Sequence, residues 1–305
     1  MTSQTIIPSH LQIEPINGAC TARCTMCTIG EWTRKPNRMS EEDFELILRK
    51  FTPYIPHLDF LTLHGCGEPL LDKGLSVKVS IAKRLGFRGV GFATNCTELN
   101  KETSQSLIKN GLDTIICSID GIKKETHEAI RRRTVFQDVV DSVRAFIQLR
   151  NDLSGYTRIL VRFIRQELNY DEWPAFHNEW SKYISHEKGD DVIRFDVHNW
   201  GKQAEQLEKE QPAELSDPLI CSDIFERFIV YSNGEVGFCC ADDNGFFKLG
   251  NIIKSDPVEV YNSGPFLKYR KYMQEGKINE LEHCKHCTIP QSRLKKINPQ
   301  RIKTG

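Results

Sequence analysis

The sequence predicts an α/β fold, in which an incomplete barrel of six strand–helix units is followed by a small cysteine-rich α+β domain. Three observations lead to this prediction. Strand-like runs alternate with helical periodicities over residues 11–200, the composition changes after residue 200, and seven of the eleven cysteines form two spaced groups. Alternating strands and helices are typical of a parallel sheet covered by helices.

Six short apolar runs, each bounded by turn residues, are the predicted strands. They cover residues 11–16, 60–63, 90–94, 114–119, 159–164 and 192–197. An open, doubly wound sheet fits the same alternation, so periodicity alone does not choose between that sheet and a barrel. The choice of a partial (β/α)6 barrel depends on the motifs described below.

Helical periodicity lies between these runs. Residues 44–51 place apolar side chains at i, i+3, i+4 and i+7, directly after a predicted N-cap at Ser40. A longer apolar stripe covers residues 136–147. Gly86 and Gly111 stand where helix C-caps belong.

The chain changes character after residue 200. Asn233-Gly234 separates two alternating apolar stretches, which predicts a hairpin, and residues 264–275 predict a short helix. We therefore predict four parts: a core over 11–200, a linker over 201–220, a second domain over 221–290 and a basic tail over 291–305.

Charge and cysteine usage exclude several classes of protein. Lys plus Arg and Asp plus Glu both number 41, so the net charge is zero and argues against a nucleic-acid or anionic-membrane partner. The sequence has neither an apolar run of membrane-spanning length nor a signal segment, which predicts a cytoplasmic protein. In that compartment an odd count of cysteines favours metal ligands, catalytic thiols or buried side chains over disulfides.

The first cysteine group follows the first predicted strand. Cys20, Cys24 and Cys27 form a C-x3-C-x2-C pattern. Soft thiolate ligands select an iron–sulfur cluster or zinc. Three thiolates would leave one iron of a four-iron cluster open, whereas a closed zinc site needs a fourth ligand, such as a distant histidine.

C-x3-C-x2-C in the loop after the first strand resembles the signature of the radical S-adenosylmethionine (radical SAM) enzymes. The resemblance implies that the open iron chelates the amino and carboxylate groups of S-adenosylmethionine. Reduction then yields a 5′-deoxyadenosyl radical that removes a hydrogen atom from the substrate. Met26 stands where family members often carry an aromatic residue, and the resemblance places its side chain against the adenine.

A second motif follows the second predicted strand. Residues 65–69, GCGEP, resemble the GGEP motif of the same family, with Cys66 at a position that glycine usually holds. The resemblance implies that Gly67 and Glu68 lie at the amino group of S-adenosylmethionine.

Polar residues at later strand ends complete the resemblance. Asn95 follows the third strand, Ser118 ends the fourth, and Arg131 comes shortly after it. By resemblance, all three belong to the binding site for S-adenosylmethionine, with Ser118 and Arg131 at its ribose and carboxylate. The alternative for each is a turn residue or a solvated side chain.

The second cysteine group lies in the C-terminal third. Cys221, Cys239, Cys284 and Cys287 are separated by 18, 45 and 3 positions and would close a site for an iron–sulfur cluster or zinc. This frame resembles the twitch form of the SPASM extension of radical SAM enzymes, which holds one auxiliary 4Fe-4S cluster. Four ligands leave no open iron, so the implied role is electron transfer.

The remaining cysteines have several interpretations. Cys240 is a spare thiol, an alternative ligand or a hydrogen-atom donor. Cys66, Cys96 and Cys117 are predicted to be buried side chains without a chemical role.

The first functional hypothesis is a radical SAM oxidoreductase. The resemblance implies two 4Fe-4S clusters, S-adenosylmethionine, and an electron donor such as flavodoxin or ferredoxin. Relatives of the twitch type include dehydrogenases of sugars and aminocyclitols, and a core beginning near residue 11 favours a small or carbohydrate substrate over a peptide. Arg162 and His198 are candidate bases, and Lys202, Glu31 and Trp32 are further candidates for mutation.

Two other hypotheses stay open. One is a radical epimerase or peptide-modifying maturase that uses Cys240 to return a hydrogen atom. The other belongs to a different class: a zinc-stabilised module without catalytic activity.

Overall fold

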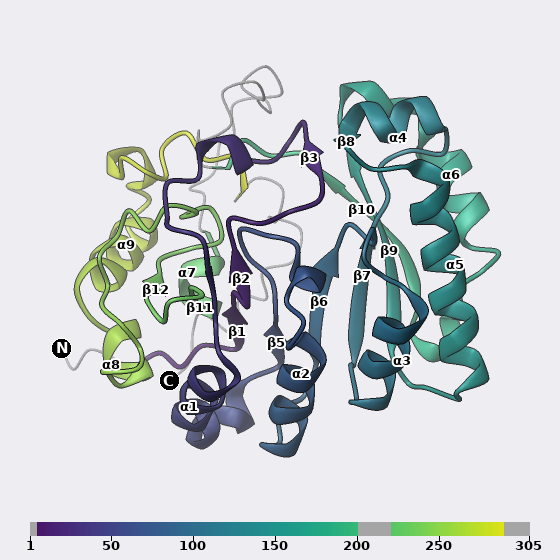
Figure 1. The fold of residues 1–305 in the computed structure, drawn as a ribbon. Coiled ribbons are helices and arrows are strands. Elements are labelled where there is room, and N and C mark those ends of the chain that lie inside the picture. Colours follow the sequence, from purple (N-terminus) through teal and green to yellow (C-terminus); the bar gives the residue numbers. More distant parts are fainter. Residues whose placement is uncertain (1–4, 201–220, 290–305) are drawn as a thin grey trace.

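The computed structural model describes residues 5–200 and 221–289 (Figure 1). The predicted linker and basic tail lie outside these residues. An eight-stranded sheet runs through the molecule in the order β10-β9-β7-β6-β5-β1-β11-β12. Its strands are β1 (His10–Ile13), β5 (Phe60–Thr62), β6 (Val90–Thr94), β7 (Thr114–Ser118), β9 (Arg158–Arg165), β10 (Asp191–Asp196), β11 (Arg227–Val230) and β12 (Val236–Gly237).

All six strands predicted in the core are present, and the sheet order identifies them as a partial barrel. Along the sheet, β1, β5, β6, β7, β9 and β10 stand in the order in which the chain forms them, and every adjacent pair is parallel. A doubly wound sheet would instead reverse its strand order at one point. The first strand ends at Ile13, earlier than predicted, because Glu14 and Pro15 interrupt it and Ile16–Asn17 form a separate short strand that pairs elsewhere.

Helices cover one face of this sheet (Figure 1). In the core they are α1 (Glu41–Phe51), α2 (Leu75–Arg84), α3 (Lys101–Lys109), α4 (Lys124–Ile130), α5 (Phe136–Asp152) and α6 (Trp173–Trp180). The predicted caps are confirmed. Ser40 Oγ accepts a hydrogen bond from the backbone N–H of Asp43, and Gly86 and Gly111 adopt φ of 92° and 84° just beyond α2 and α3.

The two faces of the sheet differ in chemistry. On β9, Val161 and Phe163 are fully buried, and the Phe163 ring lies 4.8 Å from that of Phe176 on α6. Arg162, between them, points to the opposite face and is half-buried. On β6 the inward positions are the small residues Gly91 and Ala93. The inner face of the sheet therefore carries small and polar residues where the outer face is packed with apolar side chains.

The C-terminal part is built onto the same sheet. The predicted hairpin is present, because β11 pairs antiparallel with β12. The sequence did not predict that β11 also pairs in parallel with β1, from Arg227 opposite His10 to Val230 opposite Ile13. The rest of this part contains α7 (Asp223–Glu226), α8 (Pro257–Tyr261) and α9 (Gly264–Gln274).

Four short strands form small ribbons outside the main sheet. β2 (Ile16–Asn17) pairs with β4 (Asn37–Arg38), and β3 (Arg23–Cys24) pairs with β8 (Arg131–Arg132). Among the described residues, no helix is both long and apolar enough to cross a membrane.

Candidate functional site

The loop between β2 and β4 carries Cys20, Cys24 and Cys27 and is braced from several elements. Cys24 lies in β3, where its partner Arg131 donates a hydrogen bond from Nη1 to Cys24 Sγ at 3.6 Å. Asn95 Nδ2 lies 3.6 Å from Cys20 Sγ as a donor. Two residues assigned to the cosubstrate by resemblance, Asn95 and Arg131, thus contact the cysteine sulfurs directly.

The three thiols are close enough to influence one another electrostatically. Burial, together with the neighbouring Cys24 and Cys20, raises the pKa of Cys27 to about 12. Burial also raises the pKa of Cys24, and the Arg131 guanidinium opposes that shift. Such thiols are poor nucleophiles in the free protein, and a bound metal would deprotonate them. No three His, Cys, Asp or Glu side chains in residues 5–200 and 221–289 are placed to hold a single metal ion.

The GCGEP segment packs against this loop. Gly67 has no space for a side chain, because a Cβ there would lie 2.8 Å from the carbonyl oxygen of Ile16 and 3.0 Å from that of Ala19. The backbone N–H of Glu68 donates to the Ala19 carbonyl oxygen at 2.8 Å. A glycine at position 67 therefore brings the segment against the cysteine loop.

Glu68 is buried and accepts three hydrogen bonds. Thr94 Oγ1 donates to Oε1 at 2.6 Å, the backbone N–H of Leu70 donates to Oε1 at 3.1 Å, and that of Asn95 donates to Oε2 at 2.9 Å. Burial raises the pKa of Glu68, and these hydrogen bonds oppose the shift. A carboxylate has about four acceptor positions, so one remains for an incoming ammonium or N–H donor.

Charged groups gather at the ends of β7 and β9. Arg131 forms an ion pair with Asp120 at 2.8 Å, and Arg162 Nη2 donates to Ser118 Oγ at 2.6 Å. Burial, together with the nearby Arg131, lowers the pKa of Arg162 to about 10. Arg162 therefore stays cationic at neutral pH, where a guanidinium donates hydrogen bonds and attracts anions rather than accepting protons.

Met26 and His198 both contact Trp200. The Met26 side chain is buried, and its carbonyl oxygen accepts a hydrogen bond from Trp200 Nε1 at 2.7 Å. The His198 and Trp200 rings are 4.3 Å apart in an edge-to-face arrangement. Trp200 itself was not among the predicted site residues.

The C-terminal domain encloses a cavity of about 280 Å³. Five cysteines line it, namely Cys221, Cys239, Cys240, Cys284 and Cys287. These include all four members of the predicted ligand set and the ambiguous Cys240.

The surroundings of this cavity fit an iron–sulfur cluster. Burial raises the pKa of Cys221 and Cys239, and for both the nearby Cys240 raises it further. Burial and the nearby Cys287 raise the pKa of Cys284 to about 12. Thiols that are desolvated and crowded together around an apolar-walled cavity are the donors that iron–sulfur clusters require.

Buried cysteines outside the two groups behave as predicted. Cys66, Cys96 and Cys117 are at most 6% exposed. Cys66 differs from the other two because its Sγ donates to Asp243 Oδ1 of the C-terminal domain at 3.3 Å. Asp243 carries no recognisable sequence signal of its own, and the one hint of this contact is the cysteine that replaces a glycine in GCGEP.

Two family models match the chain. Residues 15–162 match the radical SAM superfamily, and residues 221–288 match SPASM, an iron–sulfur cluster-binding domain.

Curated relatives match about half of the chain. The chain is 27% identical over 161 residues to a probable GTP 3′,8-cyclase of Methanothermobacter marburgensis, covering 53% of this chain and 50% of the relative. It is 31% identical over 169 residues to molybdenum cofactor biosynthesis protein 1 of Homo sapiens, covering 54% and 25%. The aligned segment thus spans half or less of the length of these relatives.

Solved structures match nearly the whole chain. BtrN in complex with AdoMet and 2-DOIA has a TM-score of 0.64 at 17% identity, and the match covers 93% of this chain and 94% of that one. SuiB of Streptococcus suis bound to its precursor peptide SuiA has a TM-score of 0.65 at 15% identity, covering 87% and 67%. At these identities the likeness shows a shared fold.

Proposed function

The chain belongs to the radical SAM superfamily and carries a C-terminal SPASM domain, and we propose that it is a dehydrogenase acting on an alcohol carbon of a sugar or aminocyclitol. Membership of this family and the SPASM domain imply 4Fe-4S clusters and S-adenosylmethionine as cofactors. When bound, the first cluster and S-adenosylmethionine supply the 5′-deoxyadenosyl radical that removes a hydrogen atom from that carbon. The remaining oxidation is the loss of one proton and one electron, which leaves a carbonyl group.

The residues that would hold the cofactors follow from the two cysteine groups. Cys20, Cys24 and Cys27 would bind the first cluster and leave one iron for S-adenosylmethionine. Four cysteines would bind the auxiliary cluster: Cys221, Cys239, Cys284 and Cys287.

One observation carries the proposal of an oxidation. The cavity in the C-terminal domain offers at least four thiols to one cluster, so no iron there stays open for a substrate. A closed cluster suits electron acceptance, and the substrate radical needs an acceptor for its remaining electron. The match to BtrN, which covers 93% of this chain and 94% of that chain, supports a fold shared by both parts of the chain.

The barrel's own side chains would bind and orient the ligands. Glu68 would accept a hydrogen bond from the amino group of S-adenosylmethionine, and Gly67, Asn95 and Met26 would shape the pocket around it. Ser118 and the cationic Arg131 would face its ribose and carboxylate. Arg162 would donate to a substrate oxygen rather than act as the base, and His198 is the candidate proton acceptor.

A second reaction is favoured by one specific observation. Cys240 lines the same cavity as the four proposed ligands, so a fifth thiol lies beside the auxiliary site. If Cys240 returned a hydrogen atom to the substrate, the product would be an epimer or a modified peptide, and the likeness to SuiB with its precursor peptide fits such a substrate.

Product analysis separates these reactions. The anaerobically reconstituted protein is incubated with S-adenosylmethionine, a reductant such as flavodoxin or ferredoxin, and panels of sugars, aminocyclitols and peptides. We expect one carbonyl product per 5′-deoxyadenosine, no deuterium from solvent, and unchanged turnover in Cys240→Ala. Solvent deuterium in an unoxidised product and loss of turnover in Cys240→Ala would support the epimerase or maturase. A colourless protein that contains zinc and no iron would contradict both enzymes.

A further inference from the structure

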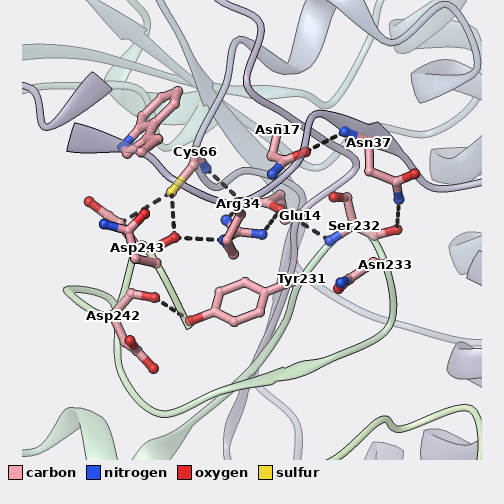
Figure 2. A network of polar contacts seen from close by, with 12 residues as sticks. Glu14, Asn17, Arg34, Asn37, Cys66, Tyr231, Ser232, Asn233, Asp242 and Asp243 are labelled. Carbon is pink, nitrogen blue, oxygen red and sulfur yellow. Dashed lines mark hydrogen bonds and ion pairs between the residues drawn. The ribbon is translucent and has the colours of Figure 1, made fainter. Parts of the chain in front are cut away.

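A buried polar cluster joins the loop after Cys27 to the loop after Cys240 (Figure 2). Asp243 is at its centre and is 8% exposed. Its Oδ2 accepts a hydrogen bond from Thr28 Oγ1, and its Oδ1 accepts one from Cys66 Sγ at 3.3 Å. Asp243 thus contacts both the residue that follows a proposed cluster ligand and the residue that replaces a glycine in GCGEP.

The same segment of the C-terminal domain makes further contacts to the cysteine loop. Arg34 Nε donates to the carbonyl oxygen of Asp243 at 2.6 Å, while its two Nη atoms bind Glu14 at 2.8 and 2.7 Å. Asn244 Oδ1 accepts a hydrogen bond from the backbone N–H of Thr33 at 2.7 Å, and Asn244 Nδ2 donates one to the carbonyl oxygen of Glu31 at 2.8 Å. The chain from Thr28 to Arg34 is therefore held along its length by two consecutive residues, Asp243 and Asn244.

A second segment of the C-terminal domain, residues 286–288, is linked to the cysteine loop through Asn199 and Trp200, which follow β10. Trp200 binds the carbonyl oxygen of Met26, as described above. The adjacent Asn199 is buried, donates to the carbonyl oxygen of His286 at 2.7 Å and accepts from the backbone N–H of Thr288 at 3.1 Å. Trp200 has a φ of 50°, a conformation that non-glycine residues keep only where surrounding contacts impose it.

These hydrogen bonds link the position of the loop after Cys240 to the position of the cysteine loop in the barrel. If the loop after Cys240 moved, Asp243 would leave the Thr28 hydroxyl and the Cys66 thiol without an acceptor in a buried setting. A polar group left unpaired in a buried setting has lost its water and gained no protein partner, so the two loops are expected to shift together.

We propose that Asp243 is a positioning residue through which the auxiliary-cluster loop sets the shape of the cysteine loop in the barrel, and with it the affinity for S-adenosylmethionine. Thr28 and Cys66, which donate hydrogen bonds to Asp243, are the barrel residues on which Asp243 would act. The proposal rests on the two-cluster arrangement of the proposed function, but not on which substrate is oxidised.

The first test measures binding rather than turnover. In reconstituted protein, the affinity for S-adenosylmethionine is measured from the change that it causes in the EPR spectrum of the reduced first cluster. We expect Asp243→Ala to weaken binding by about 5- to 150-fold, the usual range of coupling between sites, with the iron content unchanged. An affinity within twofold of wild type would overturn the proposal.

Cys66 offers a milder variant with a matched control. Cys66→Ala removes the thiol donor and should weaken binding severalfold, whereas Cys66→Ser keeps a donor and should recover most of the affinity. Cys117→Ala truncates another fully buried thiol, outside the polar cluster around Asp243, and should leave the affinity for S-adenosylmethionine unchanged. Equal affinities in Cys66→Ala and Cys117→Ala would contradict a role for the Cys66–Asp243 contact.

A double-mutant cycle tests the coupling itself. Cys239→Ala perturbs the auxiliary site on the loop that carries Asp243, and it should weaken S-adenosylmethionine binding in the wild-type background but add little in the Asp243→Ala background. The same fold-loss in both backgrounds, or none in either, would overturn the proposal. If Asp243→Ala does not fold, the cycle is run with Cys66→Ala.

These outcomes are distinguishable from a failure of the proposed function. If neither cluster loads, the proposed function fails first. If both clusters load and S-adenosylmethionine binds, but the cycle is additive, only the coupling through Asp243 is wrong.

Discussion

Position 67 shows how one residue determines the geometry of the candidate site. A Cβ there would come within 2.8–3.0 Å of two backbone carbonyl oxygens in the cysteine loop, those of Ile16 and Ala19. Backbone cannot yield as a flexible side chain can, so the GCGEP segment would have to move away from the loop. Gly67 therefore acts by allowing close approach and not by any chemistry of its own.

We expect Gly67→Ala to lower the free energy of unfolding by about 1–3 kcal/mol, the range for inserting a methyl group into a packed region. Gly30→Ala, in the cysteine loop against which Gly67 packs, is the control, because a Cβ at Gly30 meets no atom within 4 Å. Urea unfolding of the metal-free variants measures both. Equal stabilities of the two variants would contradict the close approach at position 67.

At the scale of elements, one buried ion pair ties a helix to two strands. Arg150 of α5 donates two hydrogen bonds to Asp190, at 2.9 and 2.6 Å, and both side chains are fully buried. Asp190 also accepts from the backbone N–H of Ile159 at 2.8 Å and from that of Ser185 at 2.9 Å. Asp190 precedes β10, so the pair sets where α5, β9 and β10 meet.

Asp190→Ala leaves the Arg150 guanidinium buried without its partner and should cost about 3–5 kcal/mol in the free energy of unfolding. Glu45→Ala serves as the control, since Glu45 pairs with the exposed Arg49 and such pairs contribute about 0–1 kcal/mol. Denaturant unfolding of both variants gives the comparison. A loss at Asp190 no larger than that at Glu45 would show that the buried pair does not hold these elements together.

The same pair predicts a dependence on pH. Burial opposes ionisation of Asp190, but hydrogen bonds from Arg150 and the backbone outweigh it and lower its pKa below the ordinary 3.8. A group with a lowered folded pKa stabilises the fold above its unfolded pKa and loses that effect as the pH falls through the folded value. The stability difference between wild type and Asp190→Asn should therefore be constant above about pH 5 and shrink below about pH 4. A difference that grew with acid would contradict this assignment.

For the whole molecule, the two domains share one hydrophobic core and one sheet. β11 of the C-terminal domain extends the barrel sheet beside β1, and the Phe228 ring lies 5.2 Å from that of Phe51 on α1 and 5.6 Å from that of Tyr261 on α8. All three side chains are fully buried. A domain that shares its sheet and core with its neighbour is expected to unfold with it.

Phe228→Ala should therefore lower the free energy of unfolding by about 3–5 kcal/mol in a single transition. Tyr156→Ala, at a position 95% exposed, should have little effect. Far-ultraviolet circular dichroism and the fluorescence of the barrel tryptophans should give the same midpoint. Two separate transitions would contradict a shared core.

Much of this architecture could be predicted from the sequence, because local patterns encode it. Apolar runs bounded by turn residues located the six barrel strands, a 3.6-residue apolar repeat located α5, and the Asn233-Gly234 turn located the hairpin. Cysteine spacing identified both thiol groups before any fold was known. The pairing of β11 with β1, by contrast, joins residues more than 200 positions apart, and no local pattern specifies it.

The buried polar cluster around Asp243 could not be predicted from the sequence for the same reason. Asp243, Thr28 and Arg34 are ordinary residues in ordinary loops until the fold brings them together, and only the unusual Cys66 hinted at a contact. Arg162 illustrates a second limit. The sequence placed it at a strand end as a candidate base, but the structure shows that burial lowers its pKa only to about 10, which leaves it cationic at neutral pH.

The iron content of ligand variants tests the central claim, that this chain holds one open and one closed 4Fe-4S cluster, most directly. We expect about eight irons per chain in the anaerobically reconstituted wild type and about four in either of two triple variants. One replaces Cys20, Cys24 and Cys27 by alanine and should lose the EPR response to S-adenosylmethionine. The other replaces Cys239, Cys284 and Cys287 and should keep that response, weakened. About four irons in the wild type, or an equal response in both variants, would contradict the two-cluster account.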